Sequence, residues 1–153
     1  MPTTGVDIIV HGGQVVTSSE AYDASIAIKG EKIVAIGPDD LLPPADQHID
    51  ASGKYVLPGA IDCHVHLGGH DDYLTGGIAA AHAGLTTIMP FALYNLAHRE
   101  TLPQAIARHN EEVGKVSVVD FAWHFILNND AYIFEALPEA LRMGVSSYKM
   151  FMT

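Results

Sequence analysis

The sequence predicts an α/β fold in which a β-rich N-terminal segment is followed by βα units on a parallel sheet. Residues 1–57 contain short runs of β-branched and apolar residues that are separated by glycine and proline turns. From Pro58 onward, apolar runs of strand length alternate with longer segments that carry helix start and stop signals. We therefore expect two parts with different organisation, residues 1–57 and residues 58–153.

The N-terminal segment is expected to form short antiparallel strands. Its β-rich runs read VDIIV, QVVT, ASIAI and KIVAI, and turn signals at Gly12-Gly13, Gly30 and Gly37-Pro38 lie between them. Residues 39–46 are predicted to form a loop because they contain two consecutive prolines and several aspartates.

The second part is predicted to contain four strands and three helices. The strands are expected at residues 60–66, 85–89, 116–125 and 145–152, and the helices at residues 71–83, 101–113 and 130–143. Asp71 and Thr101 occupy possible N-cap positions, and Gln104 completes a capping box with Thr101. Glycines 84, 114 and 144 follow the three helices. A break or restart is expected at Pro138, because proline lacks the backbone N–H that a helix interior needs.

Composition limits the classes of function. The chain has 153 residues, of which 48% are hydrophobic and 17% are charged, so it can bury a core. Its formal net charge of -10 disfavours nucleic acids and anionic membranes as partners. A single cysteine, Cys63, excludes an intrachain disulfide, and the first residues lack the features of a signal peptide. We therefore expect a cytoplasmic location.

A pair of histidines ends the first strand of the second part. Residues 58–66 read PGAIDCHVH, and side chains at i and i+2 of a strand point to the same face, with Cα atoms roughly 6.5 Å apart. His64 and His66 could therefore converge on one ion, although a hydrogen-bonded histidine pair is the simpler alternative. Alternation also places Asp62 on this face, where it could accept a hydrogen bond from an imidazole. A structural role for Asp62 is the alternative.

Four motifs resemble the cyclic amidohydrolases, the family of dihydropyrimidinases, hydantoinases, allantoinases and dihydroorotases. They are PGAIDCHVH at 58–66, DDYLTGGIAAAHAGLTTI at 71–88, VDFAWH at 119–124 and GVSSYKMFM at 144–152. They follow the family's order across nearly the whole chain and are most similar to dihydropyrimidinase and hydantoinase. The resemblance implies that residues 1–57 belong to a composite β-sandwich domain. It also implies that residues 58–153 form the first half of a TIM-type (β/α)8 barrel.

The resemblance implies a metal centre. His64 and His66 match the family's histidine ligands, and Lys149 matches the lysine that carbon dioxide converts to a carbamate. A carbamate is an anionic ligand with two oxygens, and it could bridge two divalent cations, usually zinc in this family, roughly 3.5 to 4 Å apart. The alternative for Lys149 is an ordinary lysine at the end of a strand.

Three further residues are candidates for the surroundings of the site. His124 ends the third predicted strand, where it could support the metal ligands or be a hydrogen-bonded core histidine. Leu67 and Phe151 match positions that shape the substrate pocket in hydantoinases, although apolar residues at a barrel rim often serve packing alone.

The function implied is hydrolysis of a small cyclic amide or ureide by a hydroxide that bridges the two metals. The resemblance further implies a homo-oligomer when the enzyme is complete. Allantoinase remains an alternative, and dihydroorotase is disfavoured because LGGHDD follows the histidine pair without an arginine to hold a substrate carboxylate. A non-catalytic scaffold is a second class of alternative, but such relatives have generally lost the metal ligands.

The length of the second part indicates an incomplete barrel. A (β/α)8 barrel needs about 250 residues, whereas about 95 residues follow Pro58. The family's two further histidines and its acid/base aspartate would lie beyond residue 153. We therefore expect an N-terminal portion of a longer enzyme that has no turnover alone, and the sequence offers no candidate for the catalytic acid.

Overall fold

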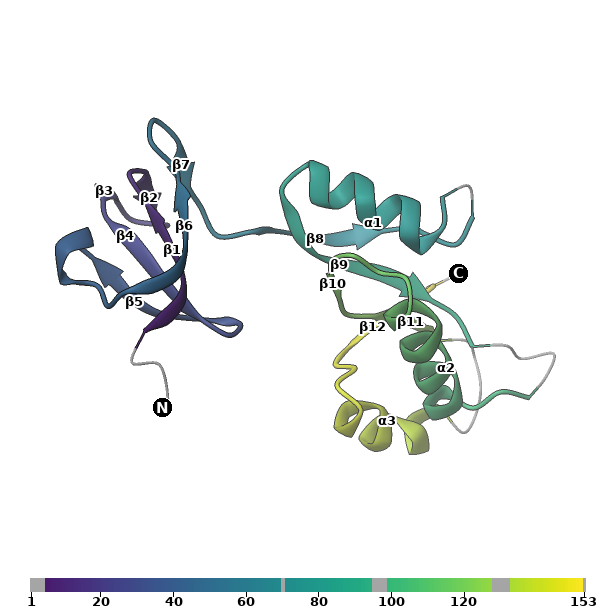
Figure 1. Ribbon diagram of the computed structural model, residues 1–153. Helices are drawn as coiled ribbons and strands as arrows, with labels where there is room; N and C mark the ends of the chain where they lie inside the picture. Colours follow the sequence, from purple (N-terminus) through teal and green to yellow (C-terminus); the bar gives the residue numbers. More distant parts are fainter. Residues whose placement is uncertain (1–4, 70, 95–98, 128–132, 153) are drawn as a thin grey trace. The chain divides into compact units, whose positions relative to one another are not determined.

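The computed structural model describes residues 5–69, 71–94, 99–127 and 133–152. The chain divides into two compact units, Met1–Pro58 and Gly59–Thr153 (Figure 1). Within the described residues, no helix is long and apolar enough to cross a membrane.

The first unit contains two small sheets with strand orders β5-β4-β1-β6 and β3-β2-β7. Its elements are β1 (Val6–His11), β2 (Gln14–Val16), β3 (Ala21–Asp23), β4 (Ser25–Lys29), β5 (Lys32–Gly37), the 3-10 turn η1 (Asp39–Leu41), β6 (Ala45–Asp50) and β7 (Tyr55–Val56). The antiparallel prediction is confirmed where β4 pairs with β1 and β5. It is also confirmed where β2 pairs with β3. Strands β6 and β7, which the antiparallel prediction did not include, pair in parallel with β1 and β2. The predicted loop at 39–46 is the 3-10 turn followed by the start of β6.

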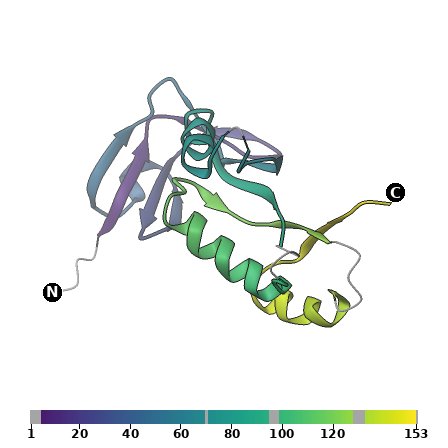
Figure 2. The same cartoon turned by 90° about the vertical axis from the view of Figure 1, so that its right-hand side faces the viewer.

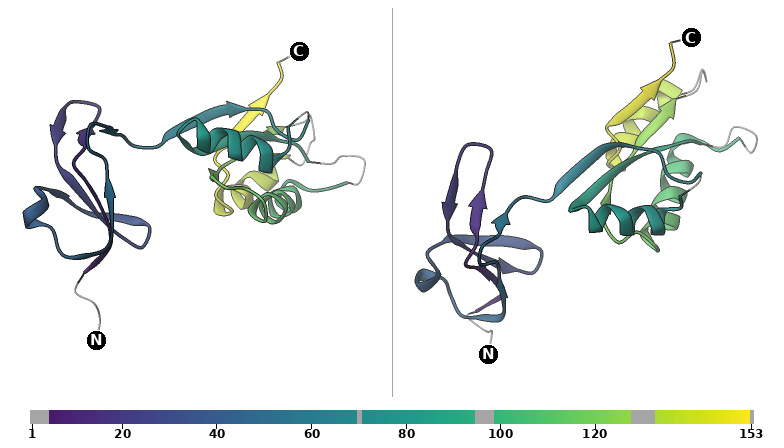
Figure 3. Two further views of the ribbon diagram at one scale, coloured as in Figure 1. Left: turned by 45° about the horizontal axis from the view of Figure 1, so that its top comes forward. Right: turned by 90° about the horizontal axis from the view of Figure 1, so that it is seen from above.

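The second unit is a curled parallel sheet with helices on its outer side. Its elements are β8 (Ala60–Val65), α1 (Tyr73–His82), β9 (Leu85–Ala92), α2 (Leu102–Gly114), β10 (Asp120–Phe121), β11 (His124–Leu127), α3 (Ile133–Arg142) and β12 (Ser147–Met150). Strand β9 pairs in parallel with β8 on one side and with β10 and β11 on the other, and β12 pairs with β11 (Figure 3). This arrangement confirms the predicted half of a (β/α)8 barrel.

Two elements of this unit differ from the prediction. The third predicted strand, residues 116–125, is divided into β10 and β11, which pair with successive parts of β9. Helix α3 continues through Pro138 without the expected break, because the packing of Ile133, Leu137 and Ala140 against the core outweighs the local cost of proline. The predicted first residues of this helix, 130–132, lie outside the described residues.

The helix ends follow local capping chemistry. Asp72, and not Asp71, caps α1: its Oδ1 accepts hydrogen bonds from the Thr75 backbone N–H at 2.7 Å and from the Thr75 hydroxyl at 2.9 Å. These bonds lower the pKa of Asp72 below its ordinary value. The predicted capping box of Thr101 and Gln104 is present at the start of α2.

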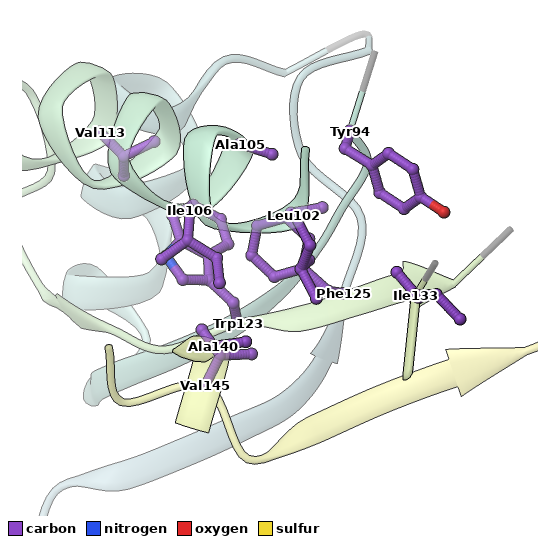
Figure 4. Packing of buried hydrophobic residues seen from close by; sticks show 11 residues of the cluster. Tyr94, Leu102, Ala105, Ile106, Val113, Trp123, Phe125, Ile133, Ala140 and Val145 are labelled. Atoms are coloured by element: carbon purple, nitrogen blue, oxygen red, sulfur yellow. The ribbon is translucent and has the colours of Figure 1, made fainter. Parts of the chain in front are cut away.

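One face of the sheet packs against the helices and forms the main core. Figure 2 shows α2 and α3 on the same side of the strands. Eleven buried residues fill this layer: Ala92, Tyr94, Leu102, Ala105, Ile106, Val113, Trp123, Phe125, Ile133, Ala140 and Val145 (Figure 4). Phe125 of β11 is fully buried, and Trp123 Nε1 donates a hydrogen bond of 2.7 Å to Asn110 Oδ1 on α2. The outward-pointing side chains of the strands thus serve the core, which leaves the alternate side chains for the inner face.

Candidate metal centre

The inner face of the half-barrel is set by strand alternation. Phe125 and Tyr148 pack in or against the helix-facing core. Their neighbours His124 on β11, and Ser147 and Lys149 on β12, therefore point to the inner side. The contacts of these residues across the inner face agree with that assignment.

Phe91 of β9 lies at the centre of this face. Its ring centroid is 4.8 Å from that of His64 and 4.7 Å from that of His66, which stacks on it at an interplanar angle of 17°. The ring of His124 stacks on it at 5.1 Å and 30°, and the Nζ of Lys149 lies 4.4 Å from its centroid. The centroids of His64 and His66 are 5.4 Å apart. The structure thus brings the three predicted metal ligands and His124 around one aromatic ring.

Sequence reasoning did not identify Phe91 as a site residue. The strand was predicted to end at residue 89, and nothing in an apolar run distinguishes a ring on the inner face from one in the core. The signal that could have found it was alternation from the buried residues Ile88 and Pro90, which places Phe91 on the opposite face.

His124 makes two hydrogen bonds across the inner face. Its Nε2 lies 2.8 Å from the backbone carbonyl oxygen of Cys63 on β8. Its Nδ1 lies 2.5 Å from the hydroxyl oxygen of Ser147 on β12. His124 therefore contacts both β8, which carries His64, and β12, which carries Lys149.

Asp62 contacts the backbone of His64. Its Oδ1 accepts a hydrogen bond of 3.0 Å from the His64 backbone N–H. This contact fits the predicted alternative, a structural role, and not a hydrogen bond from an imidazole N–H, because a short aspartate side chain reaches the amide two residues ahead more readily. Asp62 therefore fixes the backbone at His64.

The two predicted pocket residues follow different strands, Leu67 after β8 and Phe151 after β12. Leu67 packs so closely against α1 that Gly76 has no room for a side chain: a Cβ at this position would lie 2.6 Å from Leu67 Cδ2. With Phe91 it lines a cavity of about 620 Å³. Phe151 follows β12, is 63% exposed and has its ring centroid 5.0 Å from Lys149 Nζ. Phe151 lies outside the cavity that Leu67 lines.

The donor set fits part of a zinc site. The described residues contain no group of three or more His, Cys, Asp or Glu side chains that could hold a metal ion. His64 and His66 supply two imidazoles, and a lysine ammonium has no lone pair to add. Carboxylation of Lys149 would supply oxygen donors, and zinc accepts both imidazole nitrogen and carboxylate-type oxygen. With that modification, the three residues would supply the nitrogen and oxygen donors that zinc accepts.

Comparisons with known proteins agree with the fold. No family model matches the chain. It is 36% identical to the D-hydantoinase of Ralstonia pickettii, with 96% of this chain and 33% of the relative covered. It is 38% identical to the D-hydantoinase of Geobacillus stearothermophilus, with 94% of this chain and 32% of that relative covered. An Escherichia coli allantoinase is 33% identical, with 95% and 32% covered.

Solved structures show the same relationship. The dihydropyrimidinase of Brevibacillus agri superimposes with a TM-score of 0.83 and 38% identity, over 95% of this chain and 33% of that chain. A D-hydantoinase from Bacillus sp. AR9 gives a TM-score of 0.86 at 36% identity, over 96% and 33%.

The fold and the sequence together define a class of protein: this chain corresponds to the N-terminal part of a cyclic amidohydrolase. Within that family it matches D-hydantoinases and dihydropyrimidinases, as the sequence motifs predicted. The chain spans about one third of the length of the relatives it matches.

Proposed function

We propose that this chain forms the first half of the catalytic barrel of a metal-dependent hydrolase that opens cyclic amides such as hydantoins and dihydropyrimidines. The observation that carries the proposal is the meeting of His64, His66 and Lys149 around the ring of Phe91. Relatives named D-hydantoinase and dihydropyrimidinase support the substrate class. A small-molecule substrate, a homo-oligomer and a cytoplasmic location belong to the same proposal.

His64, His66 and carboxylated Lys149 would hold two divalent cations, most suitably zinc. When bound, such a pair supplies Lewis acidity and a hydroxide at neutral pH. The neutral amine of Lys149 forms a C–N bond with carbon dioxide and releases a proton, which leaves an anionic carbamate. Phe91 fills the space beside both imidazoles. The protein thereby limits the orientations that the two imidazoles can adopt.

Leu67, after β8, and Phe151, after β12, are proposed to contact the substituent of the substrate ring. Leu67 is held by its packing against α1, and Phe151 is exposed beyond the end of β12. We assign no acid or base for proton transfer to the leaving nitrogen within the described residues.

Allantoinase is the second candidate function. The Escherichia coli allantoinase that matches 95% of this chain supports it, and its substrate class is also a cyclic ureide. A non-catalytic scaffold is disfavoured because His64, His66 and Lys149 are all retained and lie around one ring.

Carboxylation of Lys149 gives a direct test. The purified chain would be incubated with zinc and ¹³C-labelled bicarbonate, and carbamate would be measured by ¹³C NMR together with zinc content. We expect both in the wild type and neither in Lys149→Arg. Lys115→Arg changes an exposed lysine that pairs with Glu111 and is the matched control. Equal carbamate signals in the wild type and Lys149→Arg would refute the assignment.

Activity can be tested in a chimera. Residues 1–153 of this chain would replace the matching region of the Geobacillus stearothermophilus D-hydantoinase, and hydrolysis of hydantoin, dihydrouracil and allantoin would be compared. We expect activity that is lost in His64→Ala, with hydantoin or dihydrouracil preferred. Preference for allantoin would favour the second candidate, and a folded, zinc-loaded chimera without any activity would contradict both.

A further inference from the structure

We infer that His124 is a positioning residue that fixes the strand of His64 and the strand of Lys149 relative to each other. Strands β8 and β12 are not neighbours, because β9 and β11 lie between them. The side chain of His124 nevertheless contacts both, through Cys63 on β8 and Ser147 on β12. The inference concerns the arrangement of the strands, and its consequence for metal binding rests on the proposed function.

The two hydrogen bonds have a defined direction. A backbone carbonyl can only accept, so Nε2 of His124 carries the proton that points to Cys63. In a neutral imidazole Nδ1 is then the acceptor, and the Ser147 hydroxyl donates to it. One tautomer of His124 therefore satisfies both contacts at once.

The Cys63 end of this connection controls the backbone at His64. The Cys63 carbonyl belongs to the peptide group that joins Cys63 to His64. The pairing of β8 with β9 is irregular here: Asp62 pairs with Ile88, the register then shifts, and Val65, the last residue of β8, pairs with Pro90. The sheet ladder therefore does not fix this peptide group, and the bonds from His124 and Asp62 supply the missing restraint.

The Ser147 end of the connection controls the approach of Lys149. Ser147 lies two residues before Lys149 on the same face of β12. The ring of His124 also stacks on Phe91, which touches both metal-ligand imidazoles and lies under the lysine amine. A change at His124 should consequently alter both sides of the proposed metal centre.

His109 offers a matched control. Its Nε2 lies 3.0 Å from the backbone carbonyl of Leu93, and its ring packs against Trp123 and Phe125 in the helix-facing layer. It is therefore a histidine bonded to a backbone carbonyl in the same unit but on the other face of the sheet. Its replacement should lower stability without moving the ligand strands.

The test compares zinc affinity, by competition titration, in His124→Gln, His124→Asn, His124→Phe and His109→Gln. A glutamine amide can replace Nε2 at Cys63, an asparagine amide can replace Nδ1 at Ser147, and phenylalanine keeps only the ring. We expect affinity to fall least for His124→Gln and most for His124→Phe, by about 10-fold or more. His109→Gln should bind zinc like the wild type. Equal affinities at all three His124 variants, or an equal loss in His109→Gln, would overturn the inference.

A measurement without metal separates this inference from the proposed function. In ¹⁵N-histidine NMR spectra of the metal-free chain, His124 should show the Nε2–H tautomer, and His124→Phe should shift the ring signals of His64 and His66. His109→Gln should leave those signals in place. If the wild type binds no zinc but these shifts occur, the proposed function fails and the positioning role stands. An Nδ1–H tautomer, or unchanged His64 and His66 signals, would refute the positioning role.

Discussion

The two faces of the parallel sheet in the second unit have different chemistry although they share the same strands. On the helix-facing side, Phe125 and Ile88 are almost completely buried in apolar surroundings. On the inner side, three imidazoles and a lysine amine all contact the ring of Phe91. Because side chains alternate along a strand, those that face the helices stabilise the fold and those that face inward form the proposed metal site. Substitutions on the outer face should change the free energy of unfolding, and those on the inner face should change metal binding.

The largest effect is expected for Lys149→Ala on the inner face. Without the amine no carbamate can form, so binding of a metal pair should be abolished, with partial recovery by added short-chain carboxylic acids. The free energy of unfolding should fall by about 1 kcal/mol, because the half-buried side chain loses the contacts of its amine with two aromatic rings. Metal analysis and urea denaturation measure the two effects. Unchanged metal content would contradict the bridging role.

Phe125→Ala on the outer face should give the largest loss of stability. The side chain is fully buried, and its removal leaves a cavity that typically costs about 3–5 kcal/mol. Phe134→Ala is the matched control, because Phe134 is 71% exposed and should change stability by less than about 0.5 kcal/mol. Similar denaturation midpoints for the two variants would show that the outer layer is not the core.

Thr101→Ala should have a smaller effect, limited to the outer layer. It removes the acceptor for the Gln104 backbone N–H at the start of α2 and should cost about 1 kcal/mol. Gln104→Ala removes the reciprocal half of the capping box and should cost less, since the Thr101 acceptor remains. Zinc affinity should be unchanged in both variants, which calorimetric titration can check.

The smallest expected effect is a pH dependence at the N-terminus of α1. Hydrogen bonds from the Thr75 backbone and hydroxyl lower the pKa of Asp72 below its ordinary value of 3.8. A carboxyl whose pKa is lowered by folding contributes stability above the unfolded pKa and loses it as pH falls through the folded pKa. Asp72→Asn should therefore reduce the acid sensitivity of thermal unfolding below pH 3.8. Identical pH profiles for Asp72→Asn and the wild type would exclude this contribution.

Local signals in the sequence were sufficient for much of the second unit. The capping box at Thr101 and the glycines after α1 and α3, Gly84 and Gly144, gave the βα rhythm, because these signals act within a few residues. Gly114, which was predicted to follow the second helix, is instead the last residue of α2. The HVH spacing placed His64 and His66 on one face for the same reason. The family resemblance then supplied Lys149, which no local rule would have connected to residues so far away in the chain.

Features that depend on distant contacts could not be predicted in this way. The parallel pairs of β6 with β1 and of β7 with β2 join segments that are far apart in the sequence. Strand β6 also has few of the apolar residues that predict a strand. The central position of Phe91 arises from the convergence of four strands. The split of the third strand and the uninterrupted helix at Pro138 likewise reflect tertiary packing that outweighs local preference.

Anomalous diffraction at the zinc edge, from crystals of the chain grown with zinc and bicarbonate, tests the central claim most directly. We predict zinc within about 2.1 Å of ring nitrogens of His64 and His66, and within about 2.2 Å of carboxyl oxygens added to Lys149. Zinc bound elsewhere, or an unmodified Lys149 amine beside a zinc-bound His64 and His66, would contradict the shared metal centre.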